Sequence, residues 1–151
     1  MSKMYEQKAG DLSKAIDIAI EAFEKIKPDD WDDVHVQHVV STYLQFKSEV
    51  LFPDPKYKNL KSLSYHEEAV FTYFQESSGK TVEYFWQKLH PENLPFKRIN
   101  KLKKILTRKK IKNDIEYDFV IDILVPYQQQ GLINTQEVEI LNVLICEFEN
   151  K

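Results

Sequence analysis

The stretch DLSKAIDIAIEAFEKIKP, residues 11–28, decides the fold class. Its apolar residues recur at spacings of three and four, which is the repeat of an α-helix with one buried face. These residues are Leu12, Ala15, Ile16, Ala19, Phe23 and Ile26. The spacing predicts a helix that runs to about Lys27 and ends at Pro28, because proline cannot donate the backbone hydrogen bond that a continuing helix needs.

Two further helices are predicted in the first half of the chain. Asp29 or Asp30 is expected to cap the second helix, which ends before the prolines of residues 53–55. The pattern Ser64-Tyr-His-Glu67 predicts a capping box at the start of the third helix. Ser77-Ser78-Gly79 then ends that helix.

The second half of the chain continues in the same way. A short helix over about residues 82–89 and a loop over residues 90–95 precede a basic helix over about residues 96–110. The last two helices are predicted to form a hairpin. Gly131 stops the first of them, and Asn134 with Glu137 forms a capping pattern for the second.

These elements predict an all-α, bundle-like array of six to seven helices, folded as one domain over residues 1–151. The chain has three glycines, which agrees with this prediction because β-rich folds need glycine in their turns. Residues 34–40 and 119–125 are rich in β-branched side chains and also suit strands. Helix is favoured for both, since each belongs to a longer stretch with helical spacing and no hairpin turn stands beside it.

The single cysteine, Cys146, excludes an intramolecular disulfide and a zinc site with several cysteines. Its apolar neighbours over residues 138–148 predict that it is buried. Residues 1–10 lack the apolar stretch of a secretory signal, and no apolar run approaches the roughly 20 residues that span a bilayer. We therefore expect a cytoplasmic protein that does not enter a membrane.

Two motifs resemble catalytic sequences, but each lacks a required residue. Ser78-Gly79-Lys80-Thr81 matches the end of a phosphate-binding loop, yet Phe74 stands where that loop needs its first glycine. His66-Glu67 begins like a metalloprotease signature, but Val70 replaces the second histidine. No catalytic residue is predicted, and the chain is not expected to be an enzyme.

Histidines leave one possible route to a metal site. Asp32, His35 and His38 are spaced by three, which is a unit that di-iron helical bundles use. Such bundles need a second unit of this kind, and the residues three positions before His66 and His90 are not acidic. No metal or cofactor is expected. A metal-dependent hydrolase that gathers histidines from several helices remains an alternative.

Charge is strongly divided along the sequence. The nine basic residues between positions 97 and 112, with no acid among them, are Lys97, Arg98, Lys101, Lys103, Lys104, Arg108, Lys109, Lys110 and Lys112. The rest of the chain holds 12 basic and all 24 acidic residues, so +9 on this segment stands against −12 elsewhere. On a helix, one stripe would contain Lys97, Lys101, Lys104, Arg108 and Lys112.

This basic stripe has three interpretations. It could bind an acidic protein surface, it could bind nucleic acid, or it could be a solvated face that pairs with acids of its own fold. Nucleic acid is the less favoured partner, because the acidic remainder of the chain repels phosphate.

A second charged feature surrounds a tryptophan. Trp31 lies between two pairs of aspartates, Asp29 with Asp30 and Asp32 with Asp33. Helix capping explains one or two of the four acids. Trp31 either packs into the core or projects as an anchor for a basic partner, since tryptophan is enriched at binding hot spots.

The sequence therefore predicts a protein without catalytic activity that binds another protein through residues 29–33 and the helix of residues 97–112. One form of this prediction is a bacterial immunity protein or antitoxin, whose acidic surface masks a basic toxin. The alternatives are a regulator that binds nucleic acid through residues 97–112 and the metal-dependent hydrolase. No stretch of the sequence matches a family motif.

Overall fold

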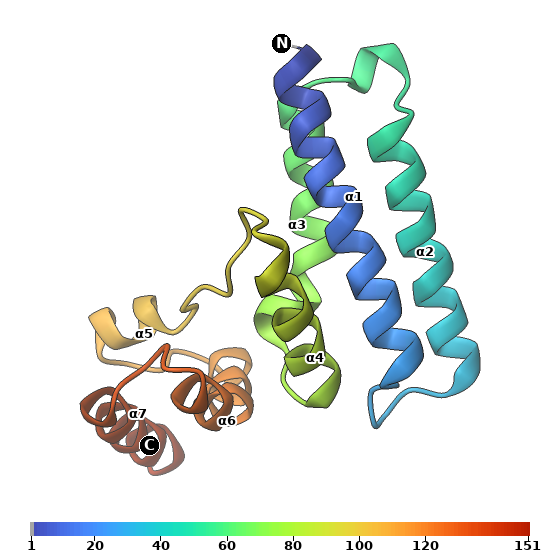
Figure 1. Cartoon of the computed structure of the whole chain (residues 1–151). Coiled ribbons are helices and arrows are strands. Elements are labelled where there is room, and N and C mark those ends of the chain that lie inside the picture. Colours follow the sequence, from blue (N-terminus) through green and yellow to red (C-terminus); the bar gives the residue numbers. More distant parts are fainter. Residues whose placement is uncertain (1) are drawn as a thin grey trace. The chain divides into compact units, whose positions relative to one another are not determined.

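A computed structural model describes residues 2–151 as an all-α structure (Figure 1). Its seven α-helices are α1 (Ser2–Lys25), α2 (Asp33–Leu51), α3 (Leu60–Glu76), α4 (Lys80–Leu89), α5 (Lys103–Arg108), α6 (Asp114–Gln129) and α7 (Thr135–Glu149). Two short 3-10 helices, η1 (Pro55–Tyr57) and η2 (His90–Glu92), lie in connections. No strand occurs in the described part of the chain, so residues 34–40 and 119–125 are helical, as favoured from the sequence.

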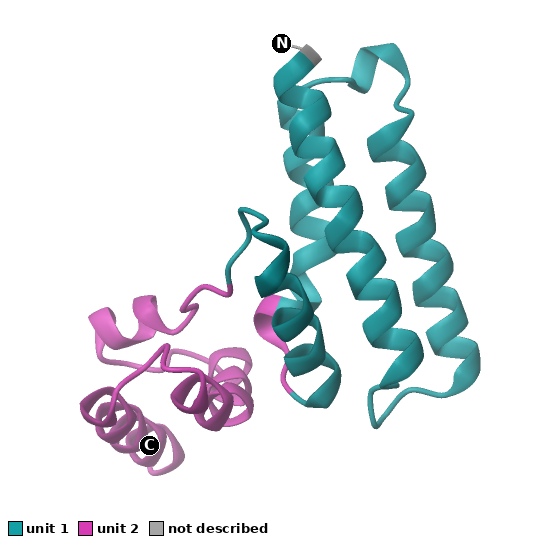
Figure 2. Cartoon of the chain, viewed as in Figure 1, with its two compact units in different colours: residues 1–74, 79–97 teal, residues 75–78, 98–151 magenta. Residues whose placement is uncertain are grey.

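The chain forms two compact units, each with a hydrophobic cluster of its own (Figure 2). Unit 1 comprises residues 1–74 and 79–97, and unit 2 comprises residues 75–78 and 98–151. The folding of residues 1–151 as a single domain stays a prediction, which requires both units to unfold in one transition.

The core of unit 1 is built around α1, which packs against α2 and α4 (Figure 1). The buried residues on the predicted face of α1 are Leu12, Ala15, Ile16, Ala19, Ala22 and Phe23. The alanines let neighbouring helices approach closely, and aromatic rings fill the remaining space. One such pair is Phe74 on α3 and Phe85 on α4, whose rings stack with centroids 3.9 Å apart.

The start of α2 differs from the prediction by two or three residues. The Asp32 carboxylate caps this helix by accepting a hydrogen bond of 2.7 Å from the His35 amide. Asp29 and Asp30, which were expected to cap it, lie in the turn that follows α1. The cap is therefore Asp32, because the turn places this later carboxylate against the free amides of the helix.

The start of α3 also differs, and the predicted capping box at residues 64–67 is wrong. The Asn59 side chain accepts a hydrogen bond of 2.9 Å from the Ser62 amide, so the helix begins one turn earlier. The Ser64 hydroxyl donates instead to the Lys61 carbonyl oxygen at 2.7 Å. Asn59 provides an earlier side-chain acceptor, and asparagine is among the best capping residues.

Unit 2 contains the predicted hairpin of α6 and α7. At the end of α6, Gly131 adopts a φ of +74°, and the Leu132 amide donates to the Tyr127 carbonyl oxygen at 2.9 Å. This is the left-handed helix stop that glycine favours. Asn134 and Glu137 form the capping box that begins α7. Both local predictions are confirmed.

The basic helix predicted over residues 96–110 is wrong in length, because only α5 is helical there. Upstream of α5, the Ile99 amide donates to the Gln75 side chain at 2.9 Å, and the Lys101 amide donates to the Tyr127 hydroxyl at 3.2 Å. These tertiary partners satisfy donors that a longer helix would have used internally. At the other end, Lys109 takes a left-handed conformation with a φ of +59°.

Cys146 is exposed, so the prediction that it is buried is wrong. α7 packs against α6 and buries Leu141 and Leu144. Cys146 follows these two residues by five and two positions, which are spacings that point away from the buried face of a helix.

Candidate functional site

The predicted basic stripe is not formed on one helix. Of its five members, Lys104 and Arg108 lie in α5, whereas Lys97, Lys101 and Lys112 lie outside any helix. Lys97 also belongs to unit 1, and the other four belong to unit 2. These five residues therefore do not form one face of a single helix, which the interpretation as a contact stripe required.

Arg108 is engaged within unit 2. Its guanidinium donates to both carboxylate oxygens of Glu116, at 2.7 and 3.1 Å, and also to the Lys110 carbonyl oxygen at 3.0 Å. Glu116 accepts a further bond from the Lys112 amide at 3.0 Å. The guanidinium holds the pKa of Glu116 below its usual range. The two charges largely satisfy each other, so Arg108 offers little to a partner.

The charges of unit 2 balance as a whole. It holds nine basic residues, from Arg98 to Lys112 together with Lys151, and nine acidic residues. Unit 1 holds the remaining 12 basic and 15 acidic residues. The charges of +9 and −12 that are separate along the sequence are thus not separate in the structure. Nine of the 24 acidic residues lie in unit 2, together with most of the basic segment.

Four lysines of unit 2 nevertheless gather around one surface hollow of about 320 Å³, which we call the lysine hollow. These lysines are Lys109, Lys110, Lys112 and Lys151, and they are all exposed. The floor of the hollow is apolar and includes Ile111, Leu144 and Phe148. An anionic group placed here would meet several ammonium groups at once.

A second hollow of about 480 Å³ runs along α7, and we call it the α7 groove. Ile140, which is 39% exposed, and Val143, which is 56% exposed, line it together with Leu144. The α7 groove and the lysine hollow share Lys109, Leu144 and Glu147. The two hollows therefore adjoin at these residues. Ile140 and Val143 lie on the side of the α7 groove, and most of the lysines lie on the side of the lysine hollow.

The α7 groove was not predicted, although the sequence carried a signal for it. The apolar residues over 138–148 were used only to predict the helix and a buried Cys146. The apolar residues of α7 nevertheless contain a further signal. They are Val138, Ile140, Leu141, Val143, Leu144, Ile145 and Phe148, and they occupy more of the helix circumference than a single buried face does. A second apolar face on a helix of a small unit indicates a contact surface.

The acidic segment of unit 1 contains Trp31 at its centre, but the ring of Trp31 is half-buried. It stacks on Phe23 with a centroid separation of 5.2 Å and contacts Tyr73 at 5.3 Å. The His35 ring meets its face edge-on at 4.4 Å. Trp31 thus packs on the aromatic core, while the four aspartates around it are exposed.

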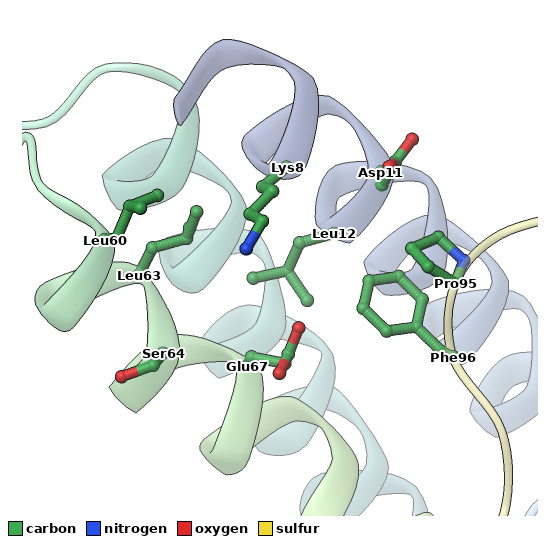
Figure 3. A pocket seen from close by; sticks show the side chains of 9 residues that line it. All are labelled: Lys8, Asp11, Leu12, Leu60, Leu63, Ser64, Glu67, Pro95 and Phe96. Atoms are coloured by element: carbon green, nitrogen blue, oxygen red, sulfur yellow. The ribbon is translucent and has the colours of Figure 1, made fainter. Parts of the chain in front are cut away.

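A smaller pocket of about 200 Å³ lies in unit 1 between α1 and α3 (Figure 3). We call it the α1–α3 pocket. Apolar side chains form its base and include Leu12, Leu63 and Phe96. Charged groups of both signs line its rim, with Lys8 on α1 and Glu67 on α3.

The four histidines do not form a metal site in the described residues, where no three His, Cys, Asp or Glu side chains lie close enough to hold an ion. His66 instead pairs with Glu49, with 2.8 Å between Nε2 and Oε2. The motif Ser78-Gly79-Lys80-Thr81 forms the turn into α4, and the Thr81 hydroxyl donates to the Ile26 carbonyl oxygen.

Within residues 2–151, every helix is too short or too polar to cross a bilayer. Comparison with known proteins adds no assignment: no family model, no curated protein and no solved structure matches this chain.

Proposed function

We propose that the protein is a non-enzymatic interaction module and that unit 2 binds an acidic, amphipathic helix of a partner protein. The observation that carries this proposal is that the α7 groove and the lysine hollow adjoin and share Lys109, Leu144 and Glu147 in their linings. An amphipathic helix has the same layout, with an apolar stripe beside charged positions.

The apolar part of the surface supplies most of the affinity. Ile140 and Val143 are three positions apart on α7. Apolar side chains at helical spacing on the partner can therefore contact both. Removing apolar surface from water contributes about 25 cal/mol for each Å², against which the entropy cost of association is set. Exposed ion pairs contribute only about 0 to 1 kcal/mol each, so the lysines mainly direct the orientation and the rate of association.

An acidic protein segment suits this surface better than nucleic acid does. Phosphate backbones gain little from apolar contacts such as those that Ile140 and Val143 offer. Unit 2 also carries no net charge, with nine residues of each sign. A partner with both apolar and acidic side chains uses the whole surface.

The exposed aspartates of unit 1 form a second proposed contact. Asp29, Asp30, Asp32 and Asp33 suit a basic partner, which corresponds to the immunity or antitoxin form of the proposal. The packing of Trp31 on Phe23 removes its ring from the set of anchors, so this contact relies on charge. Charge alone gives weak binding that falls as salt rises.

The test uses fluorescence polarisation with a labelled synthetic helix that carries leucines on one face and glutamates beside them. We expect saturable binding to the full chain, and weaker binding after Val143→Asp or after Lys110→Glu. The matched controls are Val125→Asp, which changes another exposed apolar residue of unit 2, and Lys103→Glu, which changes a lysine outside both hollows. Two further probes replace every glutamate by glutamine or scramble the leucine stripe.

Three outcomes would contradict the proposal. The control variants could weaken binding as much as the test variants do, or the scrambled probe could bind as tightly as the designed helix. Random-sequence DNA or RNA could bind more tightly than the helix, with an affinity that falls steeply with salt, which would favour the nucleic-acid alternative.

A further inference from the structure

The α1–α3 pocket of unit 1 sets one lysine and one glutamate over an apolar base. Leu12 and Leu63 are buried in its base, and the Phe96 ring forms one wall (Figure 3). The Lys8 ammonium group and the Glu67 carboxylate point toward each other across Leu12 (Figure 3). A ligand in this pocket would therefore contact both charges and the apolar base.

The two charged groups are available to a ligand. Neither Lys8 nor Glu67 forms an ion pair within 4.0 Å in the described part of the chain. The other acid on the rim, Asp11, points away from the pocket in Figure 3, and its carboxylate accepts from the Gln7 amide group at 3.3 Å. One cation and one anion thus remain directed at the same small space.

We propose that the α1–α3 pocket binds a free α-amino acid with an apolar side chain. The Lys8 ammonium group binds the ligand's carboxylate, and the Glu67 carboxylate binds its ammonium group. The ligand's side chain lies against Leu63 and Phe96. A zwitterion is the ligand class that neutralises both protein charges, whereas a simple amine or a simple acid leaves one of them unpaired.

The volume of the pocket agrees with a ligand of this size. The volume of the α1–α3 pocket is about 200 Å³. Pockets for drug-sized ligands are larger, from about 300 Å³ upward. A ligand as small as a single amino acid agrees with this volume.

The experiment titrates the full chain with L-leucine and follows the backbone amide signals of residues around the pocket by NMR. Two analogues serve as probes: isoamylamine, which is leucine without the carboxylate, and 4-methylpentanoate, which is leucine without the amine. We expect L-leucine to bind more tightly than either analogue, by up to about fivefold, because each analogue loses one exposed charge pair.

Variants assign the two roles separately. Lys8→Met should weaken the binding of L-leucine by up to about fivefold and leave the binding of isoamylamine unchanged. Glu67→Gln should weaken the binding of L-leucine and leave the binding of 4-methylpentanoate unchanged. Lys14→Met and Glu68→Gln are matched controls, because both residues are exposed neighbours that do not line the pocket. All four side chains are on the surface, and circular dichroism confirms that each variant is folded.

Two results would overturn the assignment. One is that L-leucine causes no saturable shift near Leu12, Leu63 or Phe96. The other is that L-leucine and isoamylamine bind equally, which would show that Lys8 makes no contact with the ligand. Binding of acidic helices at the α7 groove is independent of both results, because that surface lies in unit 2.

Discussion

Removal of one hydroxyl group tests how unit 2 holds its basic segment. Tyr127 is fully buried, and its hydroxyl donates to the Ile99 carbonyl oxygen at 3.1 Å and accepts from the Lys101 amide at 3.2 Å. Tyr127→Phe keeps the ring but leaves both backbone groups without this partner. An unsatisfied polar group of this kind costs about 1 to 3 kcal/mol of unfolding free energy. In urea, with an m-value of about 1 to 3 kcal/mol/M, the midpoint should fall by about 1 M.

Two probes of the same titration also test the single-domain prediction. Trp31 and Trp86 both lie in unit 1, so tryptophan fluorescence follows that unit, whereas far-UV circular dichroism follows the helices of both units. If residues 1–151 unfold as one domain, the substitution in unit 2 should shift both transitions equally. The control is Tyr65→Phe, whose side chain is 61% exposed and whose effect should stay within about 0.5 kcal/mol.

Either of two results would refute this reasoning. A midpoint change no larger than that of Tyr65→Phe would show that the Tyr127 hydroxyl does not hold the segment. A shift in the dichroism signal with no change in the fluorescence transition would show that the two units unfold separately.

Two further predictions concern stability. Gly131→Ala should destabilise the protein by about 1 kcal/mol, because φ at Gly131 is +74°, whereas Gly10→Ala in the interior of α1 should stabilise it by about 0.5 to 1 kcal/mol. An added Cβ meets no atom within 4 Å at either position, so steric contact does not distinguish the two substitutions. If urea titrations show that both substitutions change the unfolding free energy in the same direction, the argument from backbone conformation is contradicted. Arg108 lowers the pKa of Glu116 in the folded protein. The ionised carboxylate therefore stabilises the fold at every pH above its unfolded-state pKa of about 4.3. This stabilisation is lost as the pH falls through the lower pKa of the folded state. Glu116→Gln should therefore destabilise the protein at neutral pH and have little effect in acid, and a loss that grows on acidification would be inconsistent with the pair.

Local sequence signals were reliable wherever the structure they specify is itself local. The helix stop at Gly131 and the capping box of Asn134 with Glu137 depend on contacts within one turn. The face of α1 that carries Leu12 and Phe23 followed from spacing alone. Each could be predicted because the residues that decide the conformation are neighbours in the sequence.

The basic segment failed as a prediction because its conformation is decided by distant residues. Gln75 and Tyr127, which are 24 and 26 positions from their partners, take up backbone amides that a helix would have used. Leu102 and Ile105 are three positions apart, which suits a helix, and both are buried. Periodicity alone could not show that only α5 would be helical.

The candidate sites were also predicted only in part. The sequence identified the lysines at positions 109, 110 and 112 as part of a basic run, but it did not associate them with Lys151 or with the apolar side chains of α7. It gave no indication that Lys8 and Glu67 face one another, because they are 59 positions apart and lie on different helices.

By itself, the sequence determined the all-α class, the amphipathic face of α1, the hairpin of α6 and α7, and the absence of intact catalytic motifs, since each depends on spacing or on short-range hydrogen bonds. Tertiary structure alone decided which charges are used within the fold and which remain for a partner. Arg108 is paired with Glu116, whereas Lys109 and Lys110 border the lysine hollow. The physical reason is that a charge acts on what lies within a few ångströms in space, and neighbours at that range are set by packing rather than by order along the chain.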